Sequence, residues 1–493
     1  MTETGVRFTC SGCGATLPSD SVTPFVCPNR AGSSAVDHLI ERRLPALSAA
    51  HGTTIDACAS HPFVRYRRRL ASYAVARAAG WSDARFTALV GALDAAVAAV
   101  DGHGFERTAW RELPVAVGLR VQAKLELTGV AGSHKARHLF GLMLWLRVQE
   151  ALGRLPVRPP LAIASCGNAA LAAAVVARAA TWPIRVFVPE DADATVVQRL
   201  HALDAEVVIC PRAPGTPGDP TVLRFRAAVA AGALPFCCQG TDNGLTIEGG
   251  ETLGWELAED LAGSGGVDSL WVQVGGGALG AACWRGLRDA RDAGVGDGLP
   301  RLMTVQTAGA WPLGRAWLRF VAELLQRPDL ATVDLPACSR STALHPPIPG
   351  LADDAADQAT PALATIAAAA HARWAAERAV WAPRLAVHWR SYMAPWPTPP
   401  SSVAHGILDD ETYDGRALVE AMLDSGGWPV IASEPYLART AADLATHAPV
   451  TPTGAAGLAG LRQMWDDFGS ANGLGTRHAV LLTGLDRAKD DSP

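Results

Sequence analysis

From about residue 120 onward, short apolar runs of strand length alternate with longer alanine-rich or amphipathic stretches of helix length. The first series predicts strands at Leu161 to Ser165, Ile184 to Val188 and Glu206 to Cys210, separated by helices at Ala169 to Ala180 and Ala194 to Leu203. Consecutive strand–helix–strand units need right-handed crossovers and give a parallel sheet that is buried on both faces. The pattern predicts a smaller α/β domain over residues 121–240.

A second series of the same kind begins with the apolar run Ser269 to Val274. It turns through Gly275 to Gly280, continues as a helix to Asp289, and reaches another strand at Leu302 to Gln306. This order predicts a second, larger α/β domain over residues 241–487. Two doubly wound parallel-sheet domains are expected to meet at a cleft, with ligands at the carboxyl ends of the strands.

Residues 311–400 interrupt this second series. They hold many prolines around a helical stretch rich in alanine and tryptophan, Ala362 to Trp389, and strand-like runs resume at Val430 to Ala432 and Ala479 to Leu482. Residues 311–400 are therefore predicted to form a helical, proline-rich insert in the larger domain.

The N-terminal residues follow two other patterns. In residues 41–120, apolar side chains such as Phe86, Leu89 and Leu93 recur at spacings of three and four, which predicts a helical segment. Residues 1–40 contain few apolar positions and hold Cys10, Cys13 and Cys27, so they are predicted to form a small ribbon-like extension.

The three cysteines of this extension have the spacing of a zinc ribbon, with Cys10 and Cys13 separated by two residues. A second Cys-x2-Cys pair is missing, because no cysteine follows Cys27 at the required distance. His38 or Cys58 could complete a zinc site, and the alternative is a ribbon that has lost its metal.

Composition and charge narrow the class of protein. Of the 493 residues 49% are hydrophobic and 18% are charged, and the net charge of −5 argues against nucleic-acid and anionic-membrane partners. The N-terminus lacks the apolar region of a secretory signal, and the most apolar run, Ala169 to Ala180, is too short to span a bilayer. Ten cysteines in such a chain indicate reduced thiols or metal ligands. We expect a soluble cytoplasmic protein.

The chain contains only three lysines, Lys124, Lys135 and Lys489, among 43 basic residues. Ser133 follows a segment that contains Gly129 and Gly132, and it is predicted to cap a helix, which places Lys135 in the first helical turn. The positive end of the helix dipole favours the neutral, nucleophilic amine that Schiff-base formation requires. A solvated surface lysine is the alternative, and it is the expectation for Lys124 and Lys489.

The turn Ser165-Cys166-Gly167-Asn168 lies between a predicted strand and a predicted helix. Its backbone N–H groups and the Ser165 hydroxyl can form a nest for a substrate carboxylate, and the Asn168 amide can donate to a phenolate-like oxygen. Any α/β turn has a similar sequence, so this signal is weak in isolation.

Gly275-Gly276-Gly277-Ala278-Leu279 directly follows a predicted strand. Residues without bulky side chains let backbone amides approach a phosphate, although the loop lacks the Walker lysine and the dinucleotide-binding spacing, and a tight glycine turn explains it equally well. Thr483 ends the last predicted strand, where its hydroxyl could bond a neutral pyridine nitrogen, although such threonines are usually structural.

Taken together and in this order, these segments resemble the fold-type II pyridoxal-phosphate (PLP) enzymes, the tryptophan synthase β-subunit superfamily. The resemblance covers about residues 120–487 and excludes the 311–400 insert. It implies that Lys135 carries PLP as a Schiff base and serves as the general base. It further implies that residues 165–168 bind the substrate carboxylate and the cofactor's O3′, that residues 275–279 bind its phosphate, and that Thr483 bonds N1. His134 could contact the phosphate, and the alternative for it is a packed histidine. The substrate would be a small amino acid, and the assembly a homodimer.

Within the superfamily the chain is most similar to threonine synthases and to threonine/serine dehydratases. The N-terminal ribbon, Ile247-Glu-Gly-Gly-Glu-Thr252 and Pro452 to Ala459 resemble threonine synthase. The His134-Lys135 pair instead looks like the tryptophan synthase β-subunit, and the loop at Gly275 looks like the dehydratases.

The resemblance implies a PLP-dependent lyase that removes the Cα proton and eliminates the β-substituent, or a threonine-synthase-like elimination and replacement. A threonine synthase would need a second phosphate site in which Arg137, His138 and Ser165 converge. The alternatives are a β-replacement synthase of the cysteine or tryptophan synthase type, and a non-catalytic PLP-binding or zinc-ribbon regulatory protein.

Overall fold

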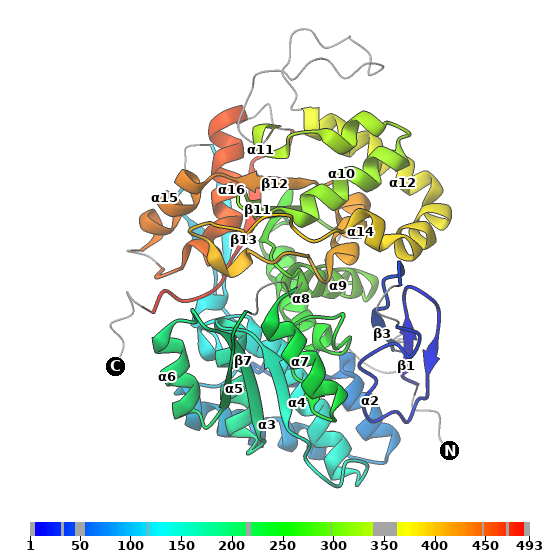
Figure 1. Ribbon diagram of the computed structural model, residues 1–493, viewed down its shortest axis with the longest axis vertical. Helices are drawn as coiled ribbons and strands as arrows, with labels where there is room; N and C mark the ends of the chain where they lie inside the picture. The colour runs from blue at the N-terminus through cyan, green and yellow to red at the C-terminus, as the bar shows by residue number, and fades with distance from the viewer. Residues whose placement is uncertain are drawn as a thin grey trace. The chain divides into compact units, whose positions relative to one another are not determined.

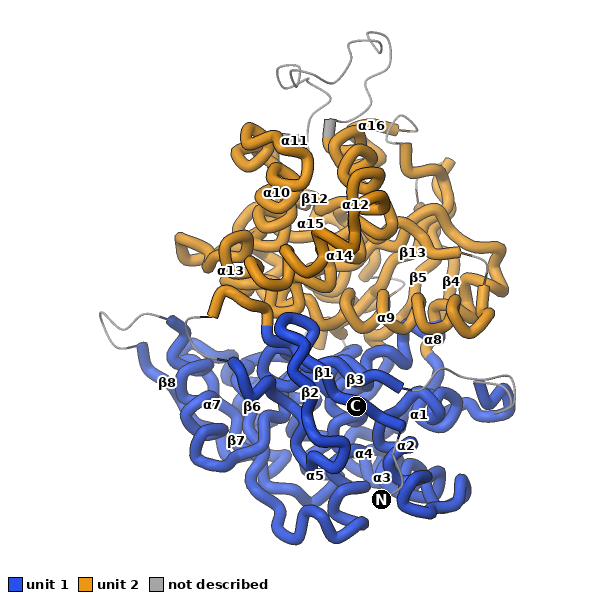
Figure 2. Tube along the Cα trace, turned by 90° about the vertical axis from the view of Figure 1, so that its right-hand side faces the viewer, with its two compact units in different colours: residues 1–31, 38–107, 128–256 blue, residues 32–37, 108–127, 257–493 orange. Residues whose placement is uncertain are grey.

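The computed structural model describes residues 5–30, 34–44, 55–115, 118–212, 218–296, 298–338, 362–445, 448–469 and 473–487. The chain divides into two units, each built from several segments (Figure 2). Unit 1 comprises residues 1–31, 38–107 and 128–256, and unit 2 comprises residues 32–37, 108–127 and 257–493. The boundary near residue 256 falls within helix α8 (Thr246–Gly263).

The main sheet of unit 1 has the strand order β8-β7-β6-β9, and all its strand pairs are parallel. Figure 1 labels β7 of this sheet. The strands are β6 (Leu161–Ala164), β7 (Ile184–Pro189), β8 (Glu206–Cys210) and the short β9 (Leu234–Pro235). The helices that connect them are α5 (Asn168–Ala179), α6 (Ala194–Ala202) and α7 (Pro220–Ala230). The carboxylates of Asp193 and Asp219 accept backbone N–H groups at the starts of α6 and α7, which fixes where these helices begin.

The remaining elements of unit 1, apart from its part of α8, precede this sheet in the sequence. They are α1 (Pro62–Arg65), η2 (Arg67–Arg69), α2 (Ala71–Ala78), α3 (Asp83–Asp101), η4 (Val130–Gly132) and α4 (Lys135–Ala151). A separate antiparallel sheet of order β2-β1-β3 is formed by β1 (Arg7–Cys10), β2 (Thr16–Leu17) and β3 (Ile40–Arg43). We call residues 5–30 and 38–43 the ribbon.

The sheet of unit 2 has the order β12-β11-β10-β13-β5-β4, and only the edge strand β4 is antiparallel to its neighbour. Its strands are β4 (Trp110–Leu113), β5 (Arg120–Leu125), β10 (Ser269–Gln273), β11 (Arg301–Thr307), β12 (Pro429–Ala432) and β13 (Arg477–Leu482). Because β10 and β13 are adjacent and parallel, the loop at Gly275 and the residue Thr483 emerge at the same edge of the sheet.

The helices of unit 2 follow its strands in the usual α/β alternation, with additional ones in the insert. They are η3 (Glu126–Thr128), which ends in unit 1, α9 (Ala278–Asp292), α10 (Pro312–Leu324), η5 (Pro328–Thr332), α11 (Leu335–Cys338), α12 (Ala362–Val387), α13 (Trp389–Tyr392), η6 (His405–Ile407), α14 (Gly415–Ser425), α15 (Glu434–Leu444) and α16 (Pro452–Phe468).

The predicted α/β class with parallel sheets is confirmed, and α12 corresponds to the predicted helical stretch of the insert. The expectation that Lys124 is solvated is wrong: its side chain is 0% exposed, and Nζ lies 2.7 Å from Asp260 Oδ2 and 2.8 Å from the Thr108 carbonyl oxygen. Lys124 lies on β5, a strand that the sequence pattern did not reveal. Lys489 lies outside the described residues. No helix among the described residues is long and apolar enough to cross a membrane.

Candidate active site

In unit 1, Lys135 is the first residue of α4, so its predicted place in the first helical turn is confirmed. The turn before it is unusual, because Ala131 has φ 56° and its N–H donates to Asp101 Oδ2 at 2.7 Å. The prediction that Ser133 caps α4 is wrong. Ser133 is extended (φ −166°, ψ 161°), the cap position belongs to His134, and no side chain hydrogen-bonds there.

The two residues before Lys135 carry buried polar atoms without protein partners. The Ser133 hydroxyl and both ring nitrogens of His134 have no hydrogen-bond partner among the described residues. Burial, reinforced by the nearby Lys135 charge, lowers the pKa of His134 well below its usual value, so the imidazole is neutral. A buried polar group without a partner costs about 1–3 kcal/mol. These atoms are therefore suited to contact a polar ligand.

The start of α4 is fixed by α8, through the sequence Ile247-Glu-Gly-Gly-Glu-Thr252. A Cβ atom at Gly249 would overlap the Arg137 carbonyl oxygen, so only glycine permits this close approach of the two helices. Arg137 Nη1 lies 2.7 Å from Glu256 Oε1, and both side chains are buried. His138 Nδ1 lies 2.9 Å from the Thr246 carbonyl oxygen, and burial lowers the pKa of His138 to about 3. Arg137 and His138 thus have protein partners and are committed to packing α4 against α8.

The turn at residues 165–168 links β6 to α5, as the sequence predicted. Gly167 occupies the cap position of α5 without a side-chain cap, and a Cβ atom there would meet nothing within 4 Å. Ser165, Gly167 and Asn168 are partly exposed and Cys166 is exposed. Helix α5 packs against both η4 and α4. The turn therefore presents backbone N–H groups at an accessible helix start of unit 1, the same unit that carries Lys135.

In unit 2, the loop Gly275-Gly276-Gly277 joins β10 to α9. Gly277 has φ 96° and precedes α9 without a side-chain cap. Ala278 and Leu279 are the first two helical residues and are buried. The glycines are also required by the packing of unit 2 itself. A Cβ atom at Gly275 would overlap the Asp409 carboxylate, and one at Gly277 would lie 2.9 Å from Thr412 Cγ2. The contact with residues 407–414 was not foreseen from the sequence.

Thr483 is buried at the end of β13 and is held by Gln273, the last residue of the neighbouring strand β10. Gln273 Nε2 donates to Thr483 Oγ1 at 2.7 Å and to the Gly454 carbonyl oxygen at 3.2 Å. A carbonyl oxygen can only accept, so this contact fixes the orientation of the amide. Thr483 Oγ1 is thus the acceptor from Gln273, and its own proton remains available for a ligand.

Sequence reasoning missed Gln273. Its signal was a single amide at the end of the otherwise apolar run Leu270 to Gln273. Gly454, in the segment Pro452 to Ala459, is needed because a Cβ atom there would overlap the Thr483 carbonyl oxygen.

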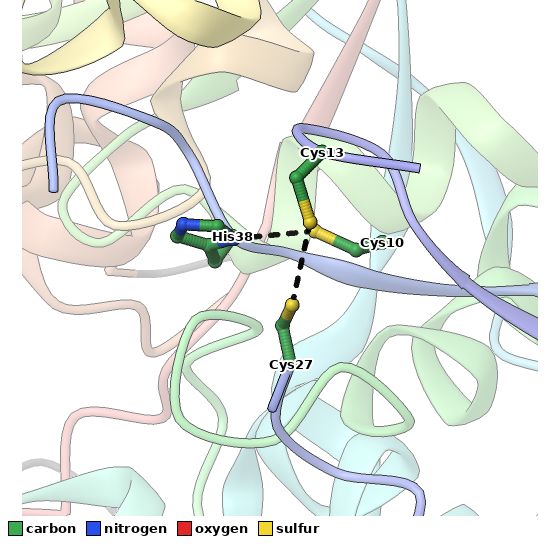
Figure 3. Close-up of side chains that lie close together, drawn as sticks. All are labelled: Cys10, Cys13, Cys27 and His38. Atoms are coloured by element: carbon green, nitrogen blue, oxygen red, sulfur yellow. Dashed lines mark hydrogen bonds between the residues drawn. The ribbon is translucent and has the colours of Figure 1, made fainter. Parts of the chain in front are cut away.

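The predicted metal-ligand cysteines come together in the ribbon. Cys10, Cys13 and Cys27 lie with His38, and all four ligand atoms are within 4.8 Å of one another (Figure 3). Among the described residues Cys58 is not part of this group. Of the two candidates for a fourth ligand, the structure places His38 there.

Each unit has an α/β sheet whose strands are parallel, apart from the edge strand β4. With a lysine at a buried helix start and a hydroxyl donor at a strand end, these features define the class: an α/β enzyme that uses an organic cofactor. The chain belongs to the family described as pyridoxal-phosphate dependent enzyme, which matches residues 105–365, just over half of the sequence. The sequence matches none of the curated proteins with which it was compared.

Solved structures resemble the fold at low sequence identity. A threonine deaminase from T.th. is 20% identical with a TM-score of 0.51, covering 82% of this chain and 99% of its own. The serine racemase of Dictyostelium discoideum is 13% identical with a TM-score of 0.51, covering 80% and 98%. A PLP-dependent aspartate racemase is 16% identical with a TM-score of 0.51, covering 82% and 97%. These likenesses support the fold.

The residues of each unit fit PLP, the cofactor of this family. In unit 1 the Ser133 hydroxyl and the His134 ring nitrogens are buried and have no hydrogen-bond partner among the described residues. They precede Lys135 in the sequence, and a lysine amine can bond the aldehyde of PLP. In unit 2 the Thr483 hydroxyl can donate to a pyridine nitrogen, and the loop before α9 offers backbone N–H groups to a phosphate.

Proposed function

We propose that this protein is a PLP-dependent lyase that acts on a small L-amino acid. It would remove the Cα proton and eliminate the β-substituent, and the products would be a keto acid and ammonia. The observation that carries this proposal is the hydrogen bond from Gln273 to Thr483, because it leaves the threonine with one proton to donate and no charge to offer.

In this proposal Lys135 bonds the cofactor through Nζ, residues 275–279 hold its phosphate, and Thr483 donates to its pyridine nitrogen N1. Bound PLP supplies an electron sink for the electron pair that remains when Cα loses its proton. A hydroxyl donor does not stabilise a proton on N1 as a carboxylate would. With its nitrogen held by the uncharged Thr483 hydroxyl, the ring would be a weaker electron sink, and early loss of a leaving group from Cβ would be favoured.

Lys135 also acts as the general base in this proposal. Its amine, released from the cofactor when the substrate binds, takes the Cα proton at Nζ. His134 is neutral because burial lowers its pKa, and Arg137 is paired with Glu256. The packing of Gly249 against the Arg137 carbonyl oxygen holds the first turn of α4 in place for this step.

The turn at Ser165 to Asn168 binds the substrate carboxylate in this proposal. Its N–H groups at the start of α5 stabilise a negative charge, and Asn168 can orient the cofactor's O3′. Arg137 and His138 are committed to Glu256 and the Thr246 carbonyl oxygen, and they therefore do not supply the second phosphate site that a threonine synthase needs. We accordingly place ammonia-lyase chemistry ahead of threonine-synthase-like replacement.

The first test is to identify the cofactor-bearing lysine. Purified protein is reduced with borohydride, and its lysine-containing peptides are mapped by mass spectrometry. The chain has three lysines, so the result is unambiguous. We expect the adduct on Lys135, and we expect Lys135→Ala to abolish both the adduct and the visible absorption band. An adduct on Lys124 or Lys489, or a band that persists in Lys135→Ala, refutes the assignment.

The second test separates the reactions. L-serine, L-threonine and O-phosphohomoserine are supplied in turn, and keto acid, ammonia, D-amino acid and free phosphate are measured. Keto acid and ammonia in equal amounts support the proposal. A D-amino acid alone indicates racemisation, phosphate with threonine indicates threonine synthesis, and turnover only with an added nucleophile indicates β-replacement. A protein that shows no turnover while its biological activity survives Lys135→Ala is a regulatory binding protein.

A further inference from the structure

The ribbon brings four metal-binding side chains together from separate parts of its backbone. Cys10 ends β1, Cys13 lies in the following turn, Cys27 in the next loop, and His38 lies just before β3. Figure 3 shows the three sulfur atoms and the imidazole ring converging on one point. Nothing in the proposed lyase chemistry uses these residues.

Two separations between these atoms can be compared with those of a tetrahedral zinc site. Cys10 Sγ lies 3.6 Å from His38 Nδ1, and Cys13 Sγ lies 3.6 Å from Cys27 Sγ. Zinc bonds of roughly 2.3 Å to sulfur and roughly 2.0 Å to nitrogen at tetrahedral angles place two sulfurs about 3.8 Å apart, and a sulfur and a nitrogen about 3.5 Å apart. Both observed separations match these values closely.

N–H donors reach two of the sulfurs. Backbone hydrogen bonds from Gly12 and Cys13 reach the Cys10 sulfur, and Asn29 Nδ2 donates to Cys13 Sγ at 3.6 Å. Such donors stabilise the negative charge of metal-bound sulfur and fix its direction. Three thiolates and one imidazole in a tetrahedron select zinc over calcium and magnesium, which prefer oxygen ligands.

We propose that Cys10, Cys13, Cys27 and His38 bind one Zn²⁺ in a closed, structural site that clamps the ribbon onto helix α4. Four protein ligands leave no position for water or substrate, so the metal takes no part in the reaction.

The role of the clamp follows from the contacts of the ribbon within unit 1. Phe8 packs edge-on against Trp145 of α4, with ring centroids 5.6 Å apart, and Trp145 Nε1 donates to the Val22 carbonyl oxygen at 2.8 Å. The Gly244 N–H donates to the Phe25 carbonyl oxygen at 2.9 Å. Val22 and Phe25 both lie in the loop that the metal closes between Cys13 and Cys27. Binding of zinc therefore holds this loop against the helix that begins at Lys135.

The ribbon is also tied to the segment that leads into and forms α8. Arg42 of β3 forms ion pairs with Glu248 and Glu251, and Arg30 Nη1 lies 3.2 Å from Asp242 Oδ1. Glu248 and Glu251 flank Gly249, which packs against α4, and its neighbour Gly250. The ribbon thus contacts both helices that position Lys135.

The test measures metal in the full-length protein. We expect about one zinc per chain in protein purified without chelator. Cys13→Ser should lose it, whereas the matched control Cys58→Ser, which removes an exposed cysteine outside the cluster, should retain it. Replacement by Co²⁺ should give sulfur-to-cobalt charge-transfer bands and intense tetrahedral bands in wild type and Cys58→Ser. Zinc content unchanged in Cys13→Ser, or a Cys13–Cys27 disulfide in place of metal, overturns the proposal.

A second variant guards against loss of folding in Cys13→Ser. His38→Cys keeps four ligands, so it should bind zinc and shift the cobalt spectrum towards that of a four-sulfur site. An unchanged cobalt spectrum in His38→Cys shows that His38 is not a ligand and refutes this ligand set. Metal content and cobalt spectra are read without PLP or substrate, so failure here is distinguishable from failure of the proposed lyase function.

Discussion

Replacing Gln273 by methionine removes the amide that orients Thr483 and leaves a side chain of similar length in the same buried position. In the wild type, Nε2 donates to both Thr483 Oγ1 and the Gly454 carbonyl oxygen. The Thr483 proton is consequently turned away from Gln273. In Gln273→Met the hydroxyl can rotate among its three staggered positions, only one of which directs the proton to a given acceptor.

The expected loss can be worked out from these contacts. Restricting the Thr483 hydroxyl to one of three rotamers costs RT ln 3, about 0.6 kcal/mol. In the wild type the Gln273 amide already restricts the hydroxyl, so PLP binding does not bear this cost. Loss of polarisation from Gln273 weakens the remaining hydrogen bond by a further amount of about 0.5 kcal/mol. A total of about 1 kcal/mol corresponds to roughly a fivefold weaker binding of PLP.

The assay is a titration of the apoprotein with PLP, followed by visible absorbance, alongside urea unfolding of the same apoprotein. Gln463→Met is the matched control, because Gln463 is also a buried glutamine of unit 2 that bonds the Ile431 carbonyl oxygen and lies outside the Thr483 network. Both variants should lose stability, and only Gln273→Met should lose PLP affinity.

Gln273→Glu sharpens this test. A carboxylate accepts the Thr483 proton, so the threonine can no longer donate it to a pyridine nitrogen. We expect a larger loss of PLP affinity than in Gln273→Met and a shifted visible band. If both Gln273 variants bind PLP with wild-type affinity and an unchanged spectrum, Thr483 does not face the cofactor nitrogen and the reasoning is wrong.

Three further predictions concern stability. Gly249→Ala places a methyl group against the Arg137 carbonyl oxygen and should cost about 1–3 kcal/mol in urea unfolding, whereas Gly263→Ala in the same helix meets open space and should be neutral or stabilising. Lys124→Met removes the ammonium that pairs with the Asp260 carboxylate and should cost about 3–5 kcal/mol, largely restored by adding Asp260→Asn, and a cost below about 1 kcal/mol contradicts a buried pair. Burial lowers the pKa of His138 to about 3 and that of His478 to about 4, so the unfolded chain binds more protons below about pH 6.5. Stability should therefore fall from about pH 6.5 downward by about 1.4 kcal/mol per pH unit for each histidine, and His478→Gln should reduce the slope.

The parts of the site that the sequence predicted are those determined by neighbouring residues. Lys135 at a helix start, the turn between β6 and α5, and the glycine loop before α9 all follow from a local change of hydrophobic period. The same holds for Thr483 at the end of β13. These signals need only a few consecutive residues, and for this reason they could be recognised without knowing what packs against them.

The parts that were missed depend on partners distant in the sequence. Lys124 is buried because Asp260, 136 residues away, neutralises it. Ser133 does not cap α4 because the Ala131 N–H is held by Asp101, which forces the turn into a different backbone path. The crowding of Gly275 by Asp409 comes from the segment that follows the insert, whose contacts no periodicity reveals.

Gly249 and Gly141 of unit 1 have a packing role that the sequence motif around Gly249 does not indicate. Ile247 to Thr252 resembled a family signature, yet in the structure Gly249 lets α8 approach the backbone of α4, and a Cβ atom at Gly141 would lie 2.7 Å from Gly249 Cα. The two glycines face each other, so the separation of the helices is set by backbone and cannot relax through a side-chain rotamer. The ion pair between Arg137 and Glu256 also joins the two helices. Trp145, further along α4, is held by the ribbon, so the position of Lys135 depends on residues outside the candidate site. Substitutions at those residues should alter cofactor binding through α4.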